Sequence, residues 1–152
     1  MKFHERIYRR LALPGAASYI EPLGKTGGCR TALDIGCGSS STLTIFRPPL
    51  VTLGMDAFPV AIDAAKARGV HDHYILGDVP KDPLEDALER FGGKVDLVTL
   101  FSVIEHLPKH AGYQFLDACE KLTGKCVLLE TPNGFLPRGP EYGNQRQRRL
   151  SD

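Results

Sequence analysis

The hydrophobic and polar positions of the chain follow two alternating patterns along most of its length. Short runs that are apolar almost throughout predict five strands, at residues 31–35, 50–55, 73–76, 95–101 and 125–130. Stretches that follow a helical pattern and close at glycines predict helices at 59–68, 83–91 and 110–122, with a shorter one near 39–47. Ahead of the first strand, three- and four-residue apolar spacing predicts an amphipathic helix over 3–13, and a short helix is expected over 16–23.

This order of elements predicts the fold class. Strands that are apolar on both sides are typical of a sheet whose two faces are covered by helices. Repeated strand–helix–strand units indicate an α/β protein with a Rossmann-like, doubly wound parallel sheet. Right-handed crossovers bring the strand C-termini to one edge, where ligands bind at the point of reversal in strand order. We divide the chain into an N-terminal helical segment (1–30), an α/β core (31–131) and an irregular tail (132–152).

Composition and charge narrow the class of protein. With 152 residues, 42% hydrophobic and 24% charged, the chain has the size and composition of one globular domain. A net charge of +1 gives no reason to expect nucleic acid or a membrane as a partner. The four cysteines form no Cys-x-x-Cys pair, and no apolar run reaches the length of a signal peptide or a membrane span. We therefore expect free thiols and a cytoplasmic protein.

The loop Asp34-Ile35-Gly36-Cys37-Gly38 follows the first predicted strand and precedes a short helix, which is the setting of a nucleotide-binding turn. Gly36 and Gly38 allow a sharp turn and a close approach of backbone to ligand. We expect the Asp34 carboxylate to point at the crevice, where a cationic amine could pair with it. Ser41 stands where a dinucleotide fingerprint has its third glycine, which argues against a nicotinamide cofactor. A plain turn is the alternative for the glycine pair.

Two more predicted strands lead into acids. Asp56 follows Gly36 by about 20 residues, the spacing at which a carboxylate binds ribose hydroxyls. Its alternative role is an N-cap for the helix over 59–68. Asp78 could accept the amino group of an adenine ring, and the Val79 amide could donate to a ring nitrogen. Three acids at successive strand ends are much harder to explain by chance than one.

In this order, the motifs resemble those of the class I S-adenosylmethionine-dependent methyltransferases. Residues 32–38, 54–56 and 77–79 are similar to the first three motifs, and 95–107 resembles the fourth strand and following helix of the small-molecule and glycan branch. The resemblance covers about residues 31–131 and implies S-adenosylmethionine as the cofactor. It also implies the cofactor-binding residues, namely Asp34, Gly36 and Gly38 around the methionine part, Asp56 with its neighbour Ala57 at the ribose, Asp78 and Val79 at the adenine, and Phe101 or Ser102 lining the cofactor.

Two side chains have open roles. His106 is the candidate general base, since imidazole suits proton removal near neutral pH, and a histidine that caps or packs the short helix is the alternative. Phe58 either packs on the adenine or belongs to the core. Some relatives bind a metal through Glu-x-x-Glu-His, but Ser102 stands at the first glutamate position here, so we predict no metal.

The resemblance implies an enzyme that methylates a small-molecule acceptor. A non-catalytic S-adenosylmethionine-binding remnant is one alternative, and a nicotinamide-dependent oxidoreductase, which Ser41 and Asp78 argue against, is another. Class I methyltransferases usually continue to a sixth and an antiparallel seventh strand, whereas this chain ends soon after its fifth. We therefore expect a C-terminally truncated chain with an exposed edge at strand 125–130, which leads either to marginal stability or to a homodimer formed through that edge.

Overall fold

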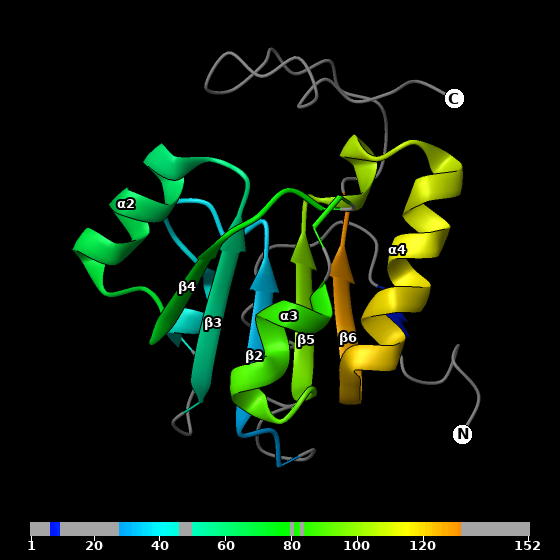
Figure 1. Ribbon diagram of the computed structural model, residues 1–152, viewed down its shortest axis with the longest axis horizontal. Coiled ribbons are helices and arrows are strands. Elements are labelled where there is room, and N and C mark those ends of the chain that lie inside the picture. Colours follow the sequence, from blue (N-terminus) through cyan, green and yellow to red (C-terminus); the bar gives the residue numbers. More distant parts are fainter. Residues whose placement is uncertain (1–6, 10–27, 46–49, 80, 83, 132–152) are drawn as a thin grey trace.

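The computed structural model describes residues 7–9, 28–45, 50–79, 81–82 and 84–131. They form a sheet of six parallel strands in the order β1-β6-β5-β2-β3-β4 (Figure 1). The strands are β1 (Ile7–Arg9), β2 (Thr31–Ile35), β3 (Val51–Asp56), β4 (His73–Leu76), β5 (Val95–Phe101) and β6 (Thr123–Glu130). The helices are α2 (Pro59–Arg68), α3 (Leu84–Leu88) and α4 (Lys109–Leu122), with 3-10 helices at Thr42–Ile45, Glu89–Phe91 and Ile104–His106. The predicted doubly wound α/β fold is confirmed.

The order of the strands reverses at β2. β3 and β4 follow on one side of it, and β5 and β6 lie on the other. Ile35, the last residue of β2, pairs with Met55 of β3 and with Leu100 of β5. The C-terminal ends of these three strands therefore meet at one edge of the sheet, the upper edge in Figure 1. This is the position at which open α/β sheets bind their ligands.

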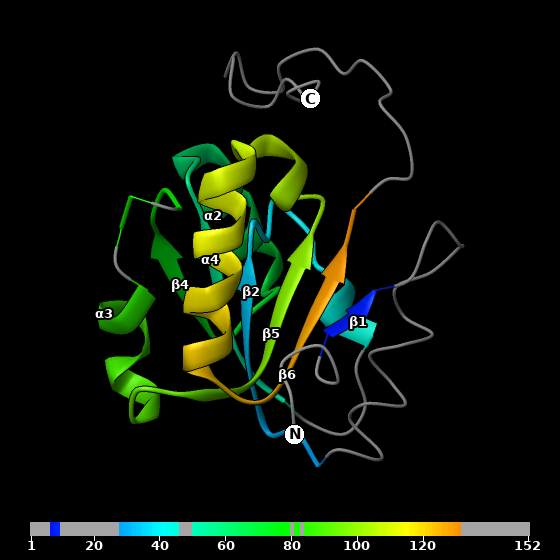
Figure 2. The ribbon, with the colours of Figure 1, turned by 90° about the vertical axis from the view of Figure 1, so that its right-hand side faces the viewer.

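Both faces of the sheet are buried, as the apolar strands predict. On one face, residues of α3 and α4 such as Leu88 and Phe115 pack with Leu33 of β2. On the other face, Ala32 of β2 packs with Leu43 from the 3-10 helix Thr42–Ile45. Figure 2 shows α3 and this 3-10 helix on opposite sides of the sheet. Alternate residues of β2 thus face two different apolar clusters.

The N-terminal prediction is wrong where the structure describes it. Ile7–Arg9 is the strand β1 and not part of a helix, and it pairs in parallel with β6 over residues 127–129. The rest of the helices predicted over 3–13 and 16–23 lies outside the described residues. The local apolar spacing indicated a helix, but pairing with a distant strand determines the conformation here, as tertiary contacts often do.

This pairing also corrects the predicted edge. β6 has β5 on one side and β1 on the other, so the strand is not exposed along the residues that β1 covers (Figure 2). The expected homodimer was based on a free edge at β6 and loses that structural basis. The order of strands places β4 at one border of the described sheet and β1 at the other.

Two boundaries differ from those predicted. α4 ends at Leu122 and β6 begins at once, so Gly124 lies inside the strand and does not end the helix. A Cβ at Gly124 would lie 3.4 Å from the Val95 carbonyl oxygen, a tight contact that favours glycine where β6 first meets β5. The short helix predicted near 39–47 is a 3-10 helix of four residues.

Within the described residues, no helix is both long and apolar enough to cross a bilayer.

Candidate functional site

The glycine loop lies between the ends of β2, β3 and β5. The Gly36 and Cys37 amides both donate to the Met55 carbonyl of β3, at 2.8 and 3.1 Å. Gly36 has φ of 69°, and a Cβ there would lie 2.5 Å from Val103 Cγ2. Only glycine fits this position, because the backbone is left-handed and the segment after β5 lies directly against it.

Gly38 differs from Gly36 in what surrounds it. Its φ is 60°, yet a Cβ at this position would meet no described atom within 4 Å. The backbone of the loop is therefore open on this side, and a ligand can approach it closely. A cradle of this kind, with glycine backbone exposed at the C-terminal edge of a parallel sheet, fits a nucleotide-type cofactor.

Asp34 is buried in a polar network, and its carboxylate does not point openly at the crevice as we expected. It is 2% exposed, and Thr99 Oγ1 donates to Oδ1 at 2.6 Å. The Ser41 hydroxyl donates to Oδ2 and also accepts from the Leu43 amide at 3.0 Å. Asp34 thus ties β2 to β5 and to the 3-10 helix that follows the glycine loop. Its geometry favours support of the loop over direct pairing with a cationic amine.

Asp56 holds the glycine loop from the side of β3. Its Oδ2 accepts from the Gly38 amide at 2.8 Å, and its Oδ1 accepts from the Phe58 amide at 2.9 Å. The N-cap of α2 is Phe58, with no side-chain capping bond, so Asp56 is not the N-cap. The residue is buried, with 8% of its surface exposed, so both carboxylate oxygens serve the backbone at the end of β3. Ala57 is exposed beside it.

The loop after β4 forms a compact turn. The Asp78 carbonyl accepts from the Lys81 and Asp82 amides, and Asp82 Oδ2 accepts from the Asp78 amide at 2.6 Å. Lys81 Nζ lies 2.9 Å from Asp78 Oδ2 in an exposed ion pair. The Gly77 amide donates to the Asp56 carbonyl at 3.0 Å, so this turn starts beside the end of β3. Asp78 and Val79 are thereby brought to the same edge of the sheet as the glycine loop.

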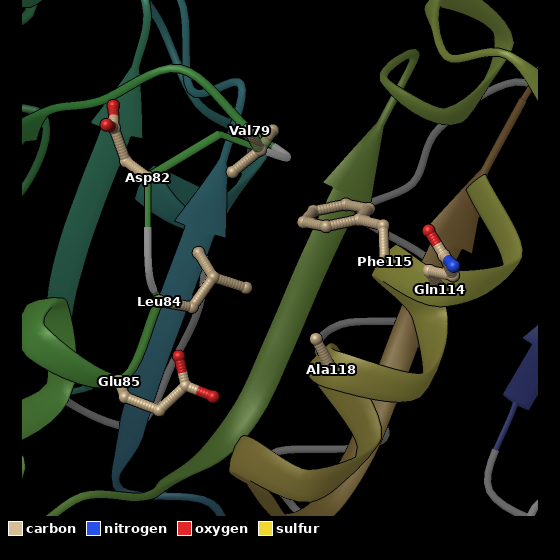
Figure 3. Close-up of a pocket in the computed structure, with 7 residues that line it drawn as sticks. All are labelled: Val79, Asp82, Leu84, Glu85, Gln114, Phe115 and Ala118. Carbon is tan, nitrogen blue, oxygen red and sulfur yellow. The ribbon is translucent and has the colours of Figure 1, made fainter. Parts of the chain in front are cut away.

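A pocket of about 190 Å³ lies between this turn and α4 (Figure 3). Phe115 extends from α4 toward Val79 and Leu84, while the Asp82 carboxylate points away from them. Val79 is the only predicted cofactor residue among those that line it, which are Val79, Asp82, Leu84, Glu85, Gln114, Phe115 and Ala118. The pocket therefore borders the predicted adenine position and does not coincide with the glycine loop.

The segment after β5 completes the edge. Phe101 ends β5, is half-buried, and packs against the Ala32 and Leu43 cluster. Ser102 has φ of 54°, a left-handed conformation that is uncommon for a residue other than glycine. Its amide donates to the Glu130 carbonyl at 3.0 Å. Such conformations are frequent at functional sites, where the surrounding structure holds them.

His106 lies in the 3-10 helix Ile104–His106, and its amide donates to the Val103 carbonyl at 3.0 Å. Its Nδ1 is buried and has no hydrogen-bond partner among the described residues. No capping bond from this side chain is found in the described structure. Among the described residues the Nδ1 atom thus has no partner that assigns the ring a task, and its role as a base stays a prediction.

Sequence reasoning did not identify three residues of the site. Thr99 and Ser41 bind Asp34, and His71 Nε2 lies 3.4 Å from Asp34 Oδ2. Ser41 was considered only as the missing third glycine, and nothing in the sequence links His71 to the loop. Asp72, next to His71, accepts from the Thr52 amide at 2.7 Å. Within the part of the chain that the structure describes, no group of three metal-binding side chains is found.

Cys37 lies inside the loop and is a protonated thiol. Burial, followed by the nearby Asp34 and Asp56 charges, raises the pKa of Cys37 from 9.0 to about 12. The Sγ atom lies 3.6 Å from the Gly38 carbonyl oxygen, to which it donates a weak hydrogen bond. A thiol held in this state fills space in the loop and does not act as a nucleophile.

We expect Cys37 to resist alkylation in the folded protein. With its pKa raised to about 12, the thiolate fraction at pH 8 is about a thousandfold below that of an unperturbed thiol. Iodoacetamide labelling at pH 8, read by peptide mass spectrometry, measures this directly. Labelling of the urea-unfolded chain is the control. Equal labelling rates in the two states would contradict the buried, protonated thiol.

A family model described as a methyltransferase domain matches residues 33–135, more than half of the chain. A search of curated proteins gave no match. The matched range contains the glycine loop, Asp56, the turn after β4 and the segment after β5.

Several solved methyltransferases share the fold. The magnesium protoporphyrin IX methyltransferase of Synechocystis, with bound S-adenosylmethionine, has a TM-score of 0.58 at 19% identity over 74% of this chain and 54% of that chain. The amino pentose methyltransferase of Micromonospora echinaspora, also with S-adenosylmethionine, has a TM-score of 0.57 at 26% identity over 78% and 48%. A plantazolicin methyltransferase with S-adenosylhomocysteine has a TM-score of 0.57 at 17% identity over 72% and 42%. The chain spans about half the length of these structures.

Proposed function

The chain belongs to the methyltransferase domain family, whose cofactor is S-adenosylmethionine, and from this premise we propose that it methylates a small-molecule acceptor. The glycine loop carries the proposal. Gly36 and Gly38 are left-handed, are held by Met55 and Asp56, and expose backbone on the Gly38 side. The loop lies where the order of the strands reverses, and the family model matches the same residues.

We propose that the residues around the loop divide the cofactor between them. Gly36 and Gly38 would bind the methionine part through their backbone, and Asp56 with Ala57 the ribose. Asp78 and Val79 would hold the adenine, with Phe101 lining the site. Asp34 would not touch the cofactor but would hold Ser41, which in turn binds the Leu43 amide of the 3-10 helix. The support for this division is the convergence of the strand ends at one edge of the sheet.

The sulfonium group of the cofactor supplies an already activated methyl group when it is bound. The protein then has to hold the acceptor atom in line with that methyl group and exclude water. We propose that His106 accepts the proton of the acceptor, since it lies on the segment that follows β5 at the same edge. No metal ligand set is needed for this chemistry.

A small molecule is the acceptor that the comparisons favour. Two of the proteins with the same fold are named as methyltransferases of magnesium protoporphyrin IX and of an amino pentose. The amino pentose methyltransferase is 26% identical to this chain. We further propose a cytoplasmic location, because all four cysteines are buried free thiols. A homodimer through β6 has no support in the strand order and is not part of the proposal.

The acceptor proposal is tested by transfer of a labelled methyl group. The purified chain is incubated with S-adenosylmethionine that carries a tritiated methyl group and with a panel of hydroxylated and aminated sugars, porphyrins and phenols. Incorporation into at least one acceptor is the expected result, and His106→Gln should lower the transfer rate by about 100-fold, within the range of a general base. Cofactor binding without transfer to any acceptor would instead indicate a non-catalytic remnant.

A further inference from the structure

His71 lies in the turn between α2 and β4, and nothing in the proposed function uses it. Its side chain is completely buried, and neither ring nitrogen has a hydrogen-bond partner among the described residues. An imidazole without such partners is unfavourable in a protein interior, where nearly all buried polar atoms are paired. A buried histidine of this kind therefore requires an explanation.

The ring lies beside Asp34 of β2, the strand from which the glycine loop continues. Its Nε2 lies 3.4 Å from Asp34 Oδ2. A Cβ on Gly54 would lie 2.4 Å from His71 Cδ2 and 3.0 Å from Cys37 Sγ, so the absence of a side chain on β3 leaves room for both. The imidazole is thus packed between the strand and the loop, with its Nε2 close to the carboxylate of Asp34.

The turn that carries His71 is held by other contacts. The His71 amide donates to the Tyr74 hydroxyl at 2.8 Å, and that hydroxyl donates to the Ala65 carbonyl of α2 at 3.0 Å. The two rings meet edge to face with centroids 5.8 Å apart. Because the Tyr74 hydroxyl holds the turn by its backbone groups, the imidazole nitrogens are not needed for its conformation, and Nε2 is available to Asp34.

Asp34 needs the donor that His71 can provide. The carboxylate is 2% exposed and accepts hydrogen bonds from Thr99 and Ser41, one on each oxygen. A buried carboxylate is stable only when donors surround it, and two hydroxyls leave part of its capacity unused. His71 Nε2 is the nearby donor that has no other hydrogen bond among the described residues.

We infer that His71 is a positioning residue for the cofactor site. It donates from Nε2 to Asp34 when the cofactor binds, and it thereby fixes Asp34, Ser41 and the glycine loop in the conformation that holds the cofactor. The inference rests on the proposed function, because it assigns His71 to the same site. It acts through Asp34 and makes no contact with the acceptor.

The competing explanation is that the ring only fills the space above Gly54. Two substitutions separate the explanations. His71→Gln places an amide nitrogen near the position of Nε2, whereas His71→Leu fills the space without a donor. If His71 positions Asp34, His71→Leu should weaken S-adenosylhomocysteine binding by about 10- to 30-fold and His71→Gln by less than about threefold, as expected for one hydrogen bond to a charged group. If the ring only packs, the two variants should bind equally well.

Tyr74→Phe is the matched control. It removes the hydroxyl that holds the same turn and keeps the aromatic ring that packs against His71. The melting temperature should fall while the affinity for S-adenosylhomocysteine stays within about twofold, because a lost neutral hydrogen bond acts on stability alone. A loss of affinity in Tyr74→Phe equal to that in His71→Leu would show that disturbing the turn is sufficient, and would overturn the positioning role.

A second measurement observes the imidazole of His71 in the wild-type protein. In wild-type protein labelled with ¹⁵N-histidine, His71 should show a protonated Nε2 whose proton is slow to exchange once S-adenosylhomocysteine is added. The His71→Gln spectrum identifies the signal. An Nε2 that stays unprotonated or freely exchanging in the saturated protein would overturn the inference. Failure of the wild-type protein to bind S-adenosylhomocysteine would instead remove the proposed function, and the inference with it.

Discussion

The Gly36→Ala substitution is expected to weaken S-adenosylhomocysteine binding by at least about 100-fold, which corresponds to about 2.7 kcal/mol. The added Cβ would lie 2.5 Å from Val103 Cγ2, on a backbone with φ of 69°. Val103 packs against the larger apolar cluster, and a β-branched side chain has few other rotamers. The clash is therefore relieved by separating the glycine loop from the segment after β5, and this opens the cofactor site. Titration calorimetry of wild type and variant gives the two affinities.

Gly69→Ala is the control for the backbone strain alone. Gly69 follows α2 with φ of 62°, and a Cβ there would meet no described atom within 4 Å. Both variants place alanine in a left-handed conformation, which costs about 1 kcal/mol of stability. Gly69→Ala should therefore melt at a lower temperature with unchanged affinity. Equal affinities in the two variants would show that the loop is not the cofactor site.

Removal of the Asp56 carboxylate is the second large effect. Asp56→Ala deletes the acceptors of the Gly38 and Phe58 amides, at 2.8 and 2.9 Å, and leaves the Gly38 side of the loop without its tether to β3. We expect a loss of at least about 30-fold in S-adenosylhomocysteine affinity and about 2 kcal/mol of stability, since both bonds are to a charged group. Calorimetry measures the first quantity and urea unfolding the second.

Asp96→Ala separates the two consequences. Asp96 also accepts from backbone amides, those of Arg30 at 2.7 Å and Thr31 at 3.4 Å, but at the opposite end of the strands from the glycine loop. This variant should lose stability and keep its affinity within about twofold, because these bonds lie where β2 and β5 begin. If Asp96→Ala lost affinity as Asp56→Ala does, the effect would be one of general stability and not of the site.

The parts of the fold that follow from local pattern were predictable from the sequence. The strands over 31–35 and 95–101 are apolar runs of the length that a buried strand needs, and the helix over 59–68 begins at a proline and closes at Gly69. The acids at strand ends were predictable as a group, because parallel strands must place their C-termini at one edge.

Features that depend on distant partners were not predictable in this way. Ile7–Arg9 has helical apolar spacing, yet it is a strand because β6 offers it a partner more than a hundred residues away in the sequence. Gly124 is a helix-ending signal by itself, but the close approach of the Val95 carbonyl makes it part of β6. Local propensity is overridden where strand pairing is available.

The candidate site shows the same limit. The sequence indicated Asp34 as a residue of the loop, but its burial among Thr99, Ser41 and His71 depends on three separate elements. His71 stands 37 positions after Asp34 in the sequence, with no motif to link the two. The direction of a carboxylate at a strand end, toward a crevice or into the sheet, is decided by such neighbours.

Binding of S-adenosylhomocysteine to the wild-type chain is the direct test of whether this domain holds the S-adenosylmethionine cofactor. Titration calorimetry with S-adenosylhomocysteine and, in parallel, with NAD compares the two cofactor classes that a glycine loop at this edge could hold. We expect saturable binding of one S-adenosylhomocysteine per chain and no heat of binding with NAD. Saturable binding of NAD, or no binding of S-adenosylhomocysteine by the folded chain, would contradict it.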